Sequence, residues 1–274
     1  MGGRGGGVTA LEVLVPTCDR PTEFAVTLSG LAAQEFADFA VIVSDQSDGA
    51  PSWDTPAARA MIRMLERRGH SVTLSRNLPR RGLAQQRGHL LSLATAPYVL
   101  FLDDDVWLEP GTLERMHSAI TELECGFVGN AVQGLSYLDD HRPHELAPYE
   151  EWAGRPEPEQ VSRDSPAWNR WTLHNAANPT HLSDRVANRP KWTAYKVAWV
   201  GGCVLYDREM LESVGGFDFW AEIPETHCGE DVLAQLRVMA KYGGAGILPT
   251  GAVHLESPTT VPDRTLQAYE AVVP

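Results

Sequence analysis

The stretch "YVLFLDDDVWLEP" at residues 98–110 joins an apolar run to three consecutive aspartates. An apolar run of this length, 98–102, is typical of a buried β-strand. Asp103, Asp104 and Asp105 follow directly, and neighbouring carboxylates disfavour each other's charged form unless a cation lies against them. The stretch therefore predicts a core strand whose end carries a concentrated negative charge.

The chain before this strand alternates between two periods. The segments "LEVLVP" (11–16), "FAVIVSD" (39–45) and "HSVTLS" (70–75) are short apolar runs that predict strands. Between them, residues at helical spacing predict one helix around 24–31, one from Pro56 to a stop at Gly69, and one over 81–96. The expected buried positions of these helices are Phe24, Leu28, Leu31, Met61, Met64, Leu65, Leu83, Leu90, Leu91 and Ala94. This order predicts an α/β fold, a mostly parallel sheet with helices on both sides.

Composition excludes some classes of protein. The 274 residues, 43% hydrophobic and 22% charged, suit a globular chain of one large domain or two small ones. The net charge of −13 argues against a sequence-independent nucleic-acid binder, which needs a basic surface. No apolar run approaches the roughly 18 residues that a membrane span requires. The segment "MGGRGGGVTA" lacks a signal-peptide core, and the four cysteines are scattered, so we expect a cytoplasmic protein with a flexible tail at 1–9.

Polar loops follow three of the predicted strands. Ligands of open α/β sheets bind beyond the carboxyl ends of the strands. Asp19 in "PTCDRP", Asp45 and Asp48 in "SDQSDG", and the aspartate triplet should therefore share one edge. No glycine-rich phosphate loop follows the first strand. The phosphates of a bound nucleotide would then need another source of positive charge, and Mg²⁺ or Mn²⁺ bound by carboxylates could supply it. The alternative is a solvated acidic turn at a strand end.

Several segments resemble one known family. "VLVPTCDRP", "SDQSDG", "RGLAQQRGHLLSLATAPYVLFLDDDVWLEPGTLERM", "WVGGCVLYDREMLESVGGFD", "HCGEDVLAQLRVMAKYG" and "AVHLES" occur in the order found in family 2 glycosyltransferases of the GT-A fold. The resemblance covers most of 11–134 and 199–257. It implies a nucleotide-sugar donor, by default a UDP-sugar, a divalent cation, and inversion at the anomeric carbon by direct displacement.

The resemblance also assigns roles to residues. It places nucleotide-sugar contacts at Pro16, Thr17, Asp19, Asp45, Asp48, Gly82, Arg87, Asp103 and Asp104. The loop "SDQSDG" stands where the family has "DDGS", which leaves the nucleobase reader open between Asp45 and Asp48. "GLAQQRG" keeps the Gly and Arg of the family's "G-x-x-x-A-R-N". Metal contacts fall to Asp105, Asp103 and His254, with Asp105 as the main ligand.

"HCGEDVLAQLRVMAKYG" (227–243) predicts an amphipathic helix that starts near Gly229. Its expected buried face comprises Val232, Leu236, Met239 and Ala240. Glu230 and Asp231 fall in the first turn, where acidic residues are also ordinary helix caps. The resemblance makes Asp231 the candidate general base, with Glu230 orienting the acceptor or sharing the role. His254 follows a strand expected from Ile247.

The middle of the chain shows no sustained periodicity. From about 135 to 192 it is polar and rich in Pro, His and Asn, which is typical of a functional lid or an insertion. We therefore expect a single domain over 10–274. Its parts are a nucleotide-sugar-binding half (10–134), an insertion or lid (135–198) and an acceptor and catalytic half (199–274). Indoles suit stacking on sugar rings, although they also anchor insertions to a core. The acceptor-binding candidates are Trp168, Trp171, Trp192 and Trp199.

Two other classes of function remain open. A sugar-nucleotide nucleotidyltransferase would favour a glycine-rich basic loop after the first strand, whereas "PTCDRP" offers only Arg20. A catalytically inactive nucleotide-sugar-binding protein would be expected to have lost a metal or base position, and all are present. Glycosyl transfer to a hydroxyl of a small molecule, such as a natural-product intermediate, is the preferred hypothesis. The sequence does not indicate an oligomeric state.

Overall fold

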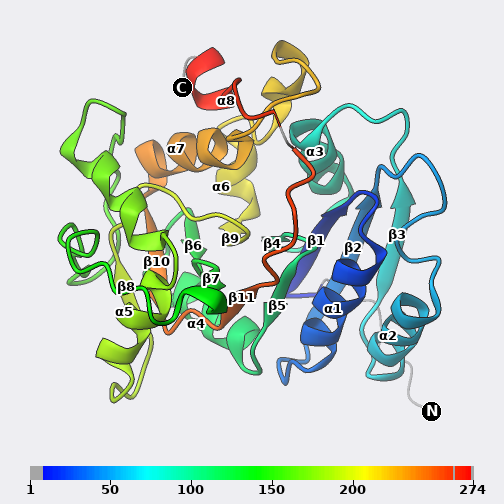
Figure 1. Ribbon diagram of the computed structural model, residues 1–274, viewed down its shortest axis with the longest axis horizontal. Coiled ribbons are helices and arrows are strands. Elements are labelled where there is room, and N and C mark those ends of the chain that lie inside the picture. The colour runs from blue at the N-terminus through cyan, green and yellow to red at the C-terminus, as the bar shows by residue number, and fades with distance from the viewer. Residues whose placement is uncertain (1–8, 262, 273–274) are drawn as a thin grey trace.

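The first half of the chain builds one side of a large sheet. The computed structural model describes residues 9–261 and 263–272, so the predicted tail lies outside the described residues except for Thr9. The order is β1 (Leu11–Thr17), α1 (Pro21–Ala32), β2 (Phe39–Asp45), α2 (Pro56–Arg67), β3 (Val72–Arg76), α3 (Leu83–Leu93) and β4 (Tyr98–Leu102). These four strands are parallel, with β1 between β2 and β4 (Figure 1). The predicted alternation of strands and helices is confirmed.

The second half extends the same sheet. The added strands are β6 (Phe127–Gly129), β8 (Thr193–Tyr195), β9 (Cys203–Asp207) and β10 (Gly244–Leu248). The strand order is β3-β2-β1-β4-β9-β6-β10-β8, with β9 antiparallel to both of its neighbours. A small sheet joins β5 (Val106–Leu108), β11 (Ala252–His254) and β7 (Gln133–Gly134). The strand expected from Ile247 is β10, which begins at Gly244, and His254 lies at the end of a separate strand, β11.

Helices cover both faces of the large sheet. Apolar side chains of α1, α2 and α4 (Thr112–Leu123) pack on one face, and those of α3, α6 (Arg208–Glu212) and α7 (Glu230–Tyr242) pack on the other. Alternate residues of β1 serve the two layers: Val13 and Val15 point to the first, and Leu14 points to the second.

Two of the predicted buried positions are wrong. Met64 is 44% exposed, because the buried stripe of α2 runs through Ala58, Ile62 and Leu65 at spacings of four and three. Ala240 is exposed although it shares a face of α7 with the buried Leu233 and Leu236, and it lies in the last turn of this helix.

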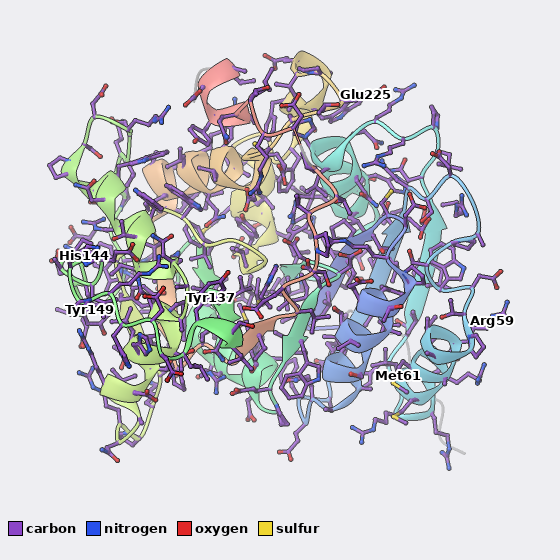
Figure 2. The ribbon with its side chains drawn as sticks, viewed as in Figure 1. Arg59, Met61, Tyr137, His144, Tyr149 and Glu225 are labelled. Carbon is purple, nitrogen blue, oxygen red and sulfur yellow. The ribbon has the colours of Figure 1, made fainter. Side chains whose placement is uncertain are left out.

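The segment 135–198 is organised by contacts with the rest of the chain. It contains η1 (Leu135–Tyr137), η2 (Pro166–His174), α5 (Asn178–Val186) and β8, and its Leu173, Leu182 and Tyr195 are buried in the core. Figure 2 shows its Tyr137, His144 and Tyr149 on the side of the molecule opposite Arg59 and Met61 of α2. The remaining elements are η3 (Asp218–Glu222) and α8 (Ala268–Ala271). Among the described residues, every helix is too short or too polar to cross a bilayer.

Candidate active site

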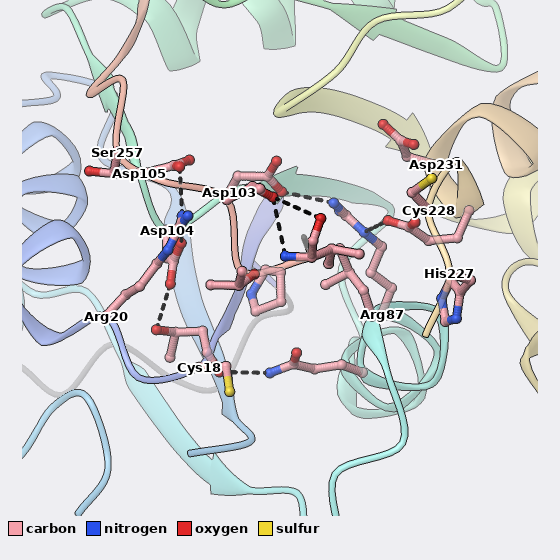
Figure 3. Close-up of a pocket in the computed structure, with 18 of the residues that line it drawn as sticks. Cys18, Arg20, Arg87, Asp103, Asp104, Asp105, His227, Cys228, Asp231 and Ser257 are labelled. Carbon is pink, nitrogen blue, oxygen red and sulfur yellow. Dashed lines mark hydrogen bonds and ion pairs between the residues drawn. The ribbon is translucent and has the colours of Figure 1, made fainter. Parts of the chain in front are cut away.

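The carboxyl edge of the sheet holds a cavity of about 320 Å³. Helices that precede a parallel strand run antiparallel to it, so the first turns of α3 and α7 lie at this edge, beside the end of β4. The lining comes from the loop after β1, these two helix starts, the aspartate triplet and the stretch after β11 (Figure 3). The lining residues predicted from the sequence are Pro16, Thr17, Arg87, Asp103, Asp104, Asp105, Glu230, Asp231 and His254.

Arg87 joins the aspartate triplet to the start of α7. Its Nη2 donates to Oδ1 of Asp103 at 2.8 Å, and its Nε donates to Oε1 of Glu230 at 3.1 Å. Burial alone would lower the pKa of Arg87, but the charges of Asp103 and Glu230 outweigh it and hold the pKa above its usual range. A buried guanidinium with a carboxylate on each side fixes both of them in place.

Arg20 lies on the other side of the triplet. Its Nη1 donates to Oδ2 of Asp105 at 2.6 Å and to Oδ1 of Asp104 at 3.2 Å. The hydroxyl of Thr17 donates to Oδ2 of Asp104 at 2.7 Å. Burial raises the pKa of Asp104 to about 7 despite these contacts. Burial, together with the charge of Asp103, also raises the pKa of Asp105. The described lining of the cavity contains five carboxylates and three arginines, Arg20, Arg87 and Arg264, so acidic groups outnumber basic ones.

The two acidic residues that begin α7 differ in their partners. Glu230 is 3% exposed and is paired with Arg87. Oδ1 of Asp231 accepts from the backbone N–H of Val232 at 2.9 Å, and neither of its oxygens has an ion pair among the described residues. Burial, with the charge of Glu230 added, raises the pKa of Asp231 to about 7. Asp231 can thus exchange a proton near neutral pH, and it differs from Asp104, whose pKa is also raised to about 7, because Asp104 is paired with Arg20.

The start of α3 depends on a close approach to the loop before α7. Gly82 precedes α3 with φ +84, and it lies against the backbone of Glu225 and the ring of His227. Nε2 of His227 accepts from the backbone N–H of Ala84 at 3.0 Å, so this ring caps α3. Gly82 lines a second cavity of about 290 Å³ that shares Leu83, Gln86 and His227 with the first.

The loop after β2 is stabilised by hydrogen bonds to the carboxylate of Asp45. Oδ2 of Asp45 accepts from the backbone N–H of Ser52 and from the hydroxyl of Ser47, and its Oδ1 accepts from the backbone N–H of Ser47. The carboxylate is fully buried and lines neither cavity. Asp48 and Asp19 are exposed and also lie outside both linings. Asp45 therefore shapes this loop, and nucleobase reading by Asp45 or Asp48 stays a prediction.

The predicted metal ligands are only partly assembled. Oδ2 of Asp105 lies 3.5 Å from Nε2 of His254, which suits two donors on one cation, since donors about 2.1 Å from an octahedral ion lie about 3 Å apart. Asp103 instead faces Arg87. Among residues 9–261 and 263–272, no group of three or more carboxylate, His or Cys side chains is arranged to hold a metal. The carboxylate and imidazole donors fit Mn²⁺ or Mg²⁺ by their chemistry, and Arg20 occupies the same carboxylate oxygen.

The predicted tryptophans do not line the main cavity. Trp192 lies elsewhere, in a cavity with Trp152 and Lys191 at the start of β8. Trp168 packs against Trp199 and Tyr269, with ring centroids 4.7 and 5.4 Å apart. Tyr269 in turn packs against Gly229, next to the acidic start of α7. Trp171 is 40% exposed on η2. Acceptor binding by Trp168, Trp171, Trp192 and Trp199 stays a prediction.

Sequence reasoning assigned no role to two residues of this site, Arg20 and His227, or to part of the stretch after β11. Arg20 lines the cavity and His227 also caps α3. The lining residues of the later stretch are Ser257, Thr259, Thr260, Val261 and Arg264. Arg20 immediately follows Asp19 in "PTCDRP", and His227 immediately precedes the "CGED" motif. In both cases, the position next to a motif was the only feature of the sequence that could have indicated a role in the site.

Comparison with known proteins identifies the family. The model of "Glycosyl transferase family 2" matches residues 12–214. A search of curated proteins finds no significant match.

Similar solved structures share the fold. S. aureus TarS 1-349 in complex with UDP-GlcNAc is 17% identical, with 92% of this chain and 60% of that chain covered and a TM-score of 0.54. The mannosyltransferase PcManGT from Pyrobaculum calidifontis, in complex with GDP-Man and Mn²⁺, is 18% identical, with 93% and 59% covered and a TM-score of 0.56. The chain thus spans about 60% or less of these proteins. With three quarters of its length matched by the family model, the chain belongs to glycosyl transferase family 2.

Proposed function

We propose that this protein moves a sugar from a nucleoside diphosphate donor to a hydroxyl of an acceptor, with inversion at the anomeric carbon. One observation carries the proposal: Asp231 lines the same cavity as the aspartate triplet, burial raises its pKa to about 7, and it forms no ion pair within the described part of the chain. Glu230, its neighbour, is tied to Arg87. This difference favours Asp231 as the base and Glu230 as its positioning neighbour, a choice that the sequence left open.

The reaction requires one proton transfer and one displacement. The Asp231 carboxylate accepts the proton of the acceptor hydroxyl while that oxygen bonds to the anomeric carbon. The bond between this carbon and the diphosphate oxygen breaks, and the nucleoside diphosphate leaves with the electron pair. Attack from the face opposite the leaving group inverts the configuration. Such proton transfer typically contributes about 10²–10⁴ in rate.

Donor binding falls to the other side of the cavity. Pro16, Thr17 and Gln86 line it together with the triplet, and Gln86 is fixed by donating to the backbone oxygens of Thr17 and Ser44. We propose a UDP-sugar as the default donor, with GDP- and dTDP-sugars to be compared. Asp105 and His254 would hold Mn²⁺ or Mg²⁺, which when bound would neutralise charge on the diphosphate.

The acceptor would enter beside the start of α7. The cluster of Trp168, Trp199 and Tyr269 offers aromatic faces next to Gly229, which suits a sugar or another hydroxyl-bearing small molecule. We keep a cytoplasmic location as part of the proposal, in agreement with the four free cysteines.

The experiment presents UDP-, GDP- and dTDP-sugars with Mn²⁺ to the protein and a library of hydroxyl-bearing acceptors. Mass spectrometry detects the product, and the anomeric coupling constant in its NMR spectrum gives its configuration. A product of inverted configuration supports the proposal. A retained configuration removes direct displacement, and formation of a nucleotide sugar from a sugar phosphate and a nucleoside triphosphate would indicate a nucleotidyltransferase instead.

A further inference from the structure

Arg20 occupies a position where a cation is needed. Its side chain is 12% exposed, and it contacts Asp104 and Asp105, whose side chains are 8% and 9% exposed. A guanidinium buried next to two carboxylates offsets part of their negative charge without a bound metal ion. The guanidinium thus lies on the carboxylate oxygen of Asp105 that faces His254.

The same guanidinium holds the stretch that crosses the cavity. We call residues 255–261 the crossing segment; it follows β11 and runs toward α8 past the end of β4 (Figure 1). Nη2 of Arg20 donates to the carbonyl oxygen of Pro258. The hydroxyl of Ser257 donates to Glu23 of α1 at 3.1 Å. Thr259, Thr260 and Val261 line the cavity. Arg20 therefore contacts the aspartates and the crossing segment at once.

His254 is tied to the crossing segment in a way that opposes metal binding. Its Nδ1 accepts from the backbone N–H of Glu256 at 2.9 Å. In a neutral ring the proton then lies on Nε2, the nitrogen that faces Asp105. Ligation through Nε2 requires the proton on Nδ1, where it would point at the N–H of Glu256. A cation here therefore requires the turn at Leu255 and Glu256 to change.

We propose that Arg20 is a positioning residue whose guanidinium substitutes for the divalent cation at Asp105, and that cation binding displaces it and releases the crossing segment from the carbonyl of Pro258. The inference rests on the metal site of the proposed function. A cation bound to Asp105 or to His254 would disturb the crossing segment in either case. Asp105 is linked to Pro258 through Arg20, and His254 accepts a hydrogen bond from Glu256 directly. A cation within about 2.1 Å of Oδ2 cannot share that oxygen with a guanidinium nitrogen at 2.6 Å without strong repulsion.

The test measures Mn²⁺ binding by electron paramagnetic resonance, with and without UDP. Arg20→Met removes the competing cation, and Arg20→Gln keeps a hydrogen-bond donor in case the first variant folds poorly. Arg264→Met is the matched control, because Arg264 lines the same cavity but forms no ion pair with the triplet among the described residues. We expect the Arg20 variants to bind Mn²⁺ about tenfold more tightly than wild type, and Arg264→Met to change affinity by less than about threefold.

Hydrogen exchange on the unmodified protein provides a second readout. Mn²⁺ should speed amide exchange in peptides that cover the crossing segment, and in Arg20→Met these peptides should exchange fast with or without Mn²⁺. Equal Mn²⁺ affinity in wild type, the Arg20 variants and Arg264→Met, with exchange in the crossing segment unaffected by Mn²⁺, would overturn the inference and leave the proposed function standing. If wild type binds UDP but no Mn²⁺, the metal site of the proposed function fails and the inference fails with it.

Discussion

Replacing Gly82 with alanine should destabilise the fold and disturb the site together. At φ +84 and ψ 172, a backbone region that is essentially restricted to glycine, an L-residue costs about 1–3 kcal/mol relative to glycine. The new Cβ would also overlap the carbonyl oxygen of Glu225 and lie 2.7 Å from Cε1 of His227. Relieving an overlap of this kind costs about 1–3 kcal/mol. We therefore expect the free energy of unfolding to fall by about 2–6 kcal/mol in total.

Gly69→Ala is the matched control for this change. Gly69 has φ +96, and an added Cβ would meet nothing within 4 Å, so only the backbone cost of about 1–2 kcal/mol applies. Urea unfolding of both variants separates the close approach from the backbone cost. In Gly82→Ala the His227 cap of α3 should also be lost, so UDP binding should weaken, whereas Gly69→Ala should bind UDP like wild type. Equal stability losses and equal UDP affinities in the two variants would refute this reasoning.

Three further changes have definite expected outcomes. Asp105→Ala should abolish transfer and weaken Mn²⁺-dependent nucleotide binding while circular dichroism stays unchanged, and unaltered turnover would contradict the metal assignment. Since the pKa of Asp231 is raised to about 7 and a base acts unprotonated, kcat/KM should fall about tenfold per pH unit below pH 7 and level off above it; a flat profile from pH 5 to 8 would exclude this base. Burial lowers the pKa of His174 to about 4 in the folded protein. As the pH falls through about 6.5, His174 therefore becomes protonated in the unfolded chain but stays neutral in the folded protein. Stability should therefore be full above pH 6.5 and decline toward pH 4 by about 1–3 kcal/mol, and in urea titrations His174→Gln should show a smaller decline.

The first half of the fold was predictable because its signals are local. β4 is a continuous apolar run, and β1 and β2 are mostly apolar and fully buried, as expected for strands covered on both faces. Met64 was misplaced because two methionines and a leucine in one turn allow several stripes, and only packing against α1 and the sheet selects the one through Ile62.

The segment 135–198 was not predictable in the same way. Its structure depends on contacts between residues far apart in the sequence, such as β8 pairing with β10 and the hydrogen bond between Nε2 of His174 and the hydroxyl of Tyr195. Contacts of this kind leave no periodic pattern in the sequence. None of the residues that line the main cavity comes from 135–198, whereas the stretch after β11 contributes several, and an acceptor role for 135–198 stays a prediction.

The site was predictable where a motif ends a strand or starts a helix. Asp103, Arg87 and Asp231 converge because the end of β4 and the starts of α3 and α7 share one edge. Which of Glu230 and Asp231 is better placed to act as the base was not predictable. The answer depends on which carboxylate pairs with Arg87, which lies 143 positions away from Glu230 in the sequence. Contacts between distant segments decide such roles.

The most direct test of the central claim measures donor affinity and transfer rate together in Asp231→Asn. Asparagine keeps the size of the side chain and removes its ability to accept a proton at neutral pH. The proposal predicts a transfer rate lower by about 10²–10⁴, with donor affinity within about threefold of wild type. Transfer near the wild-type rate would show that Asp231 is not the base, and loss of donor binding would show that its role is structural.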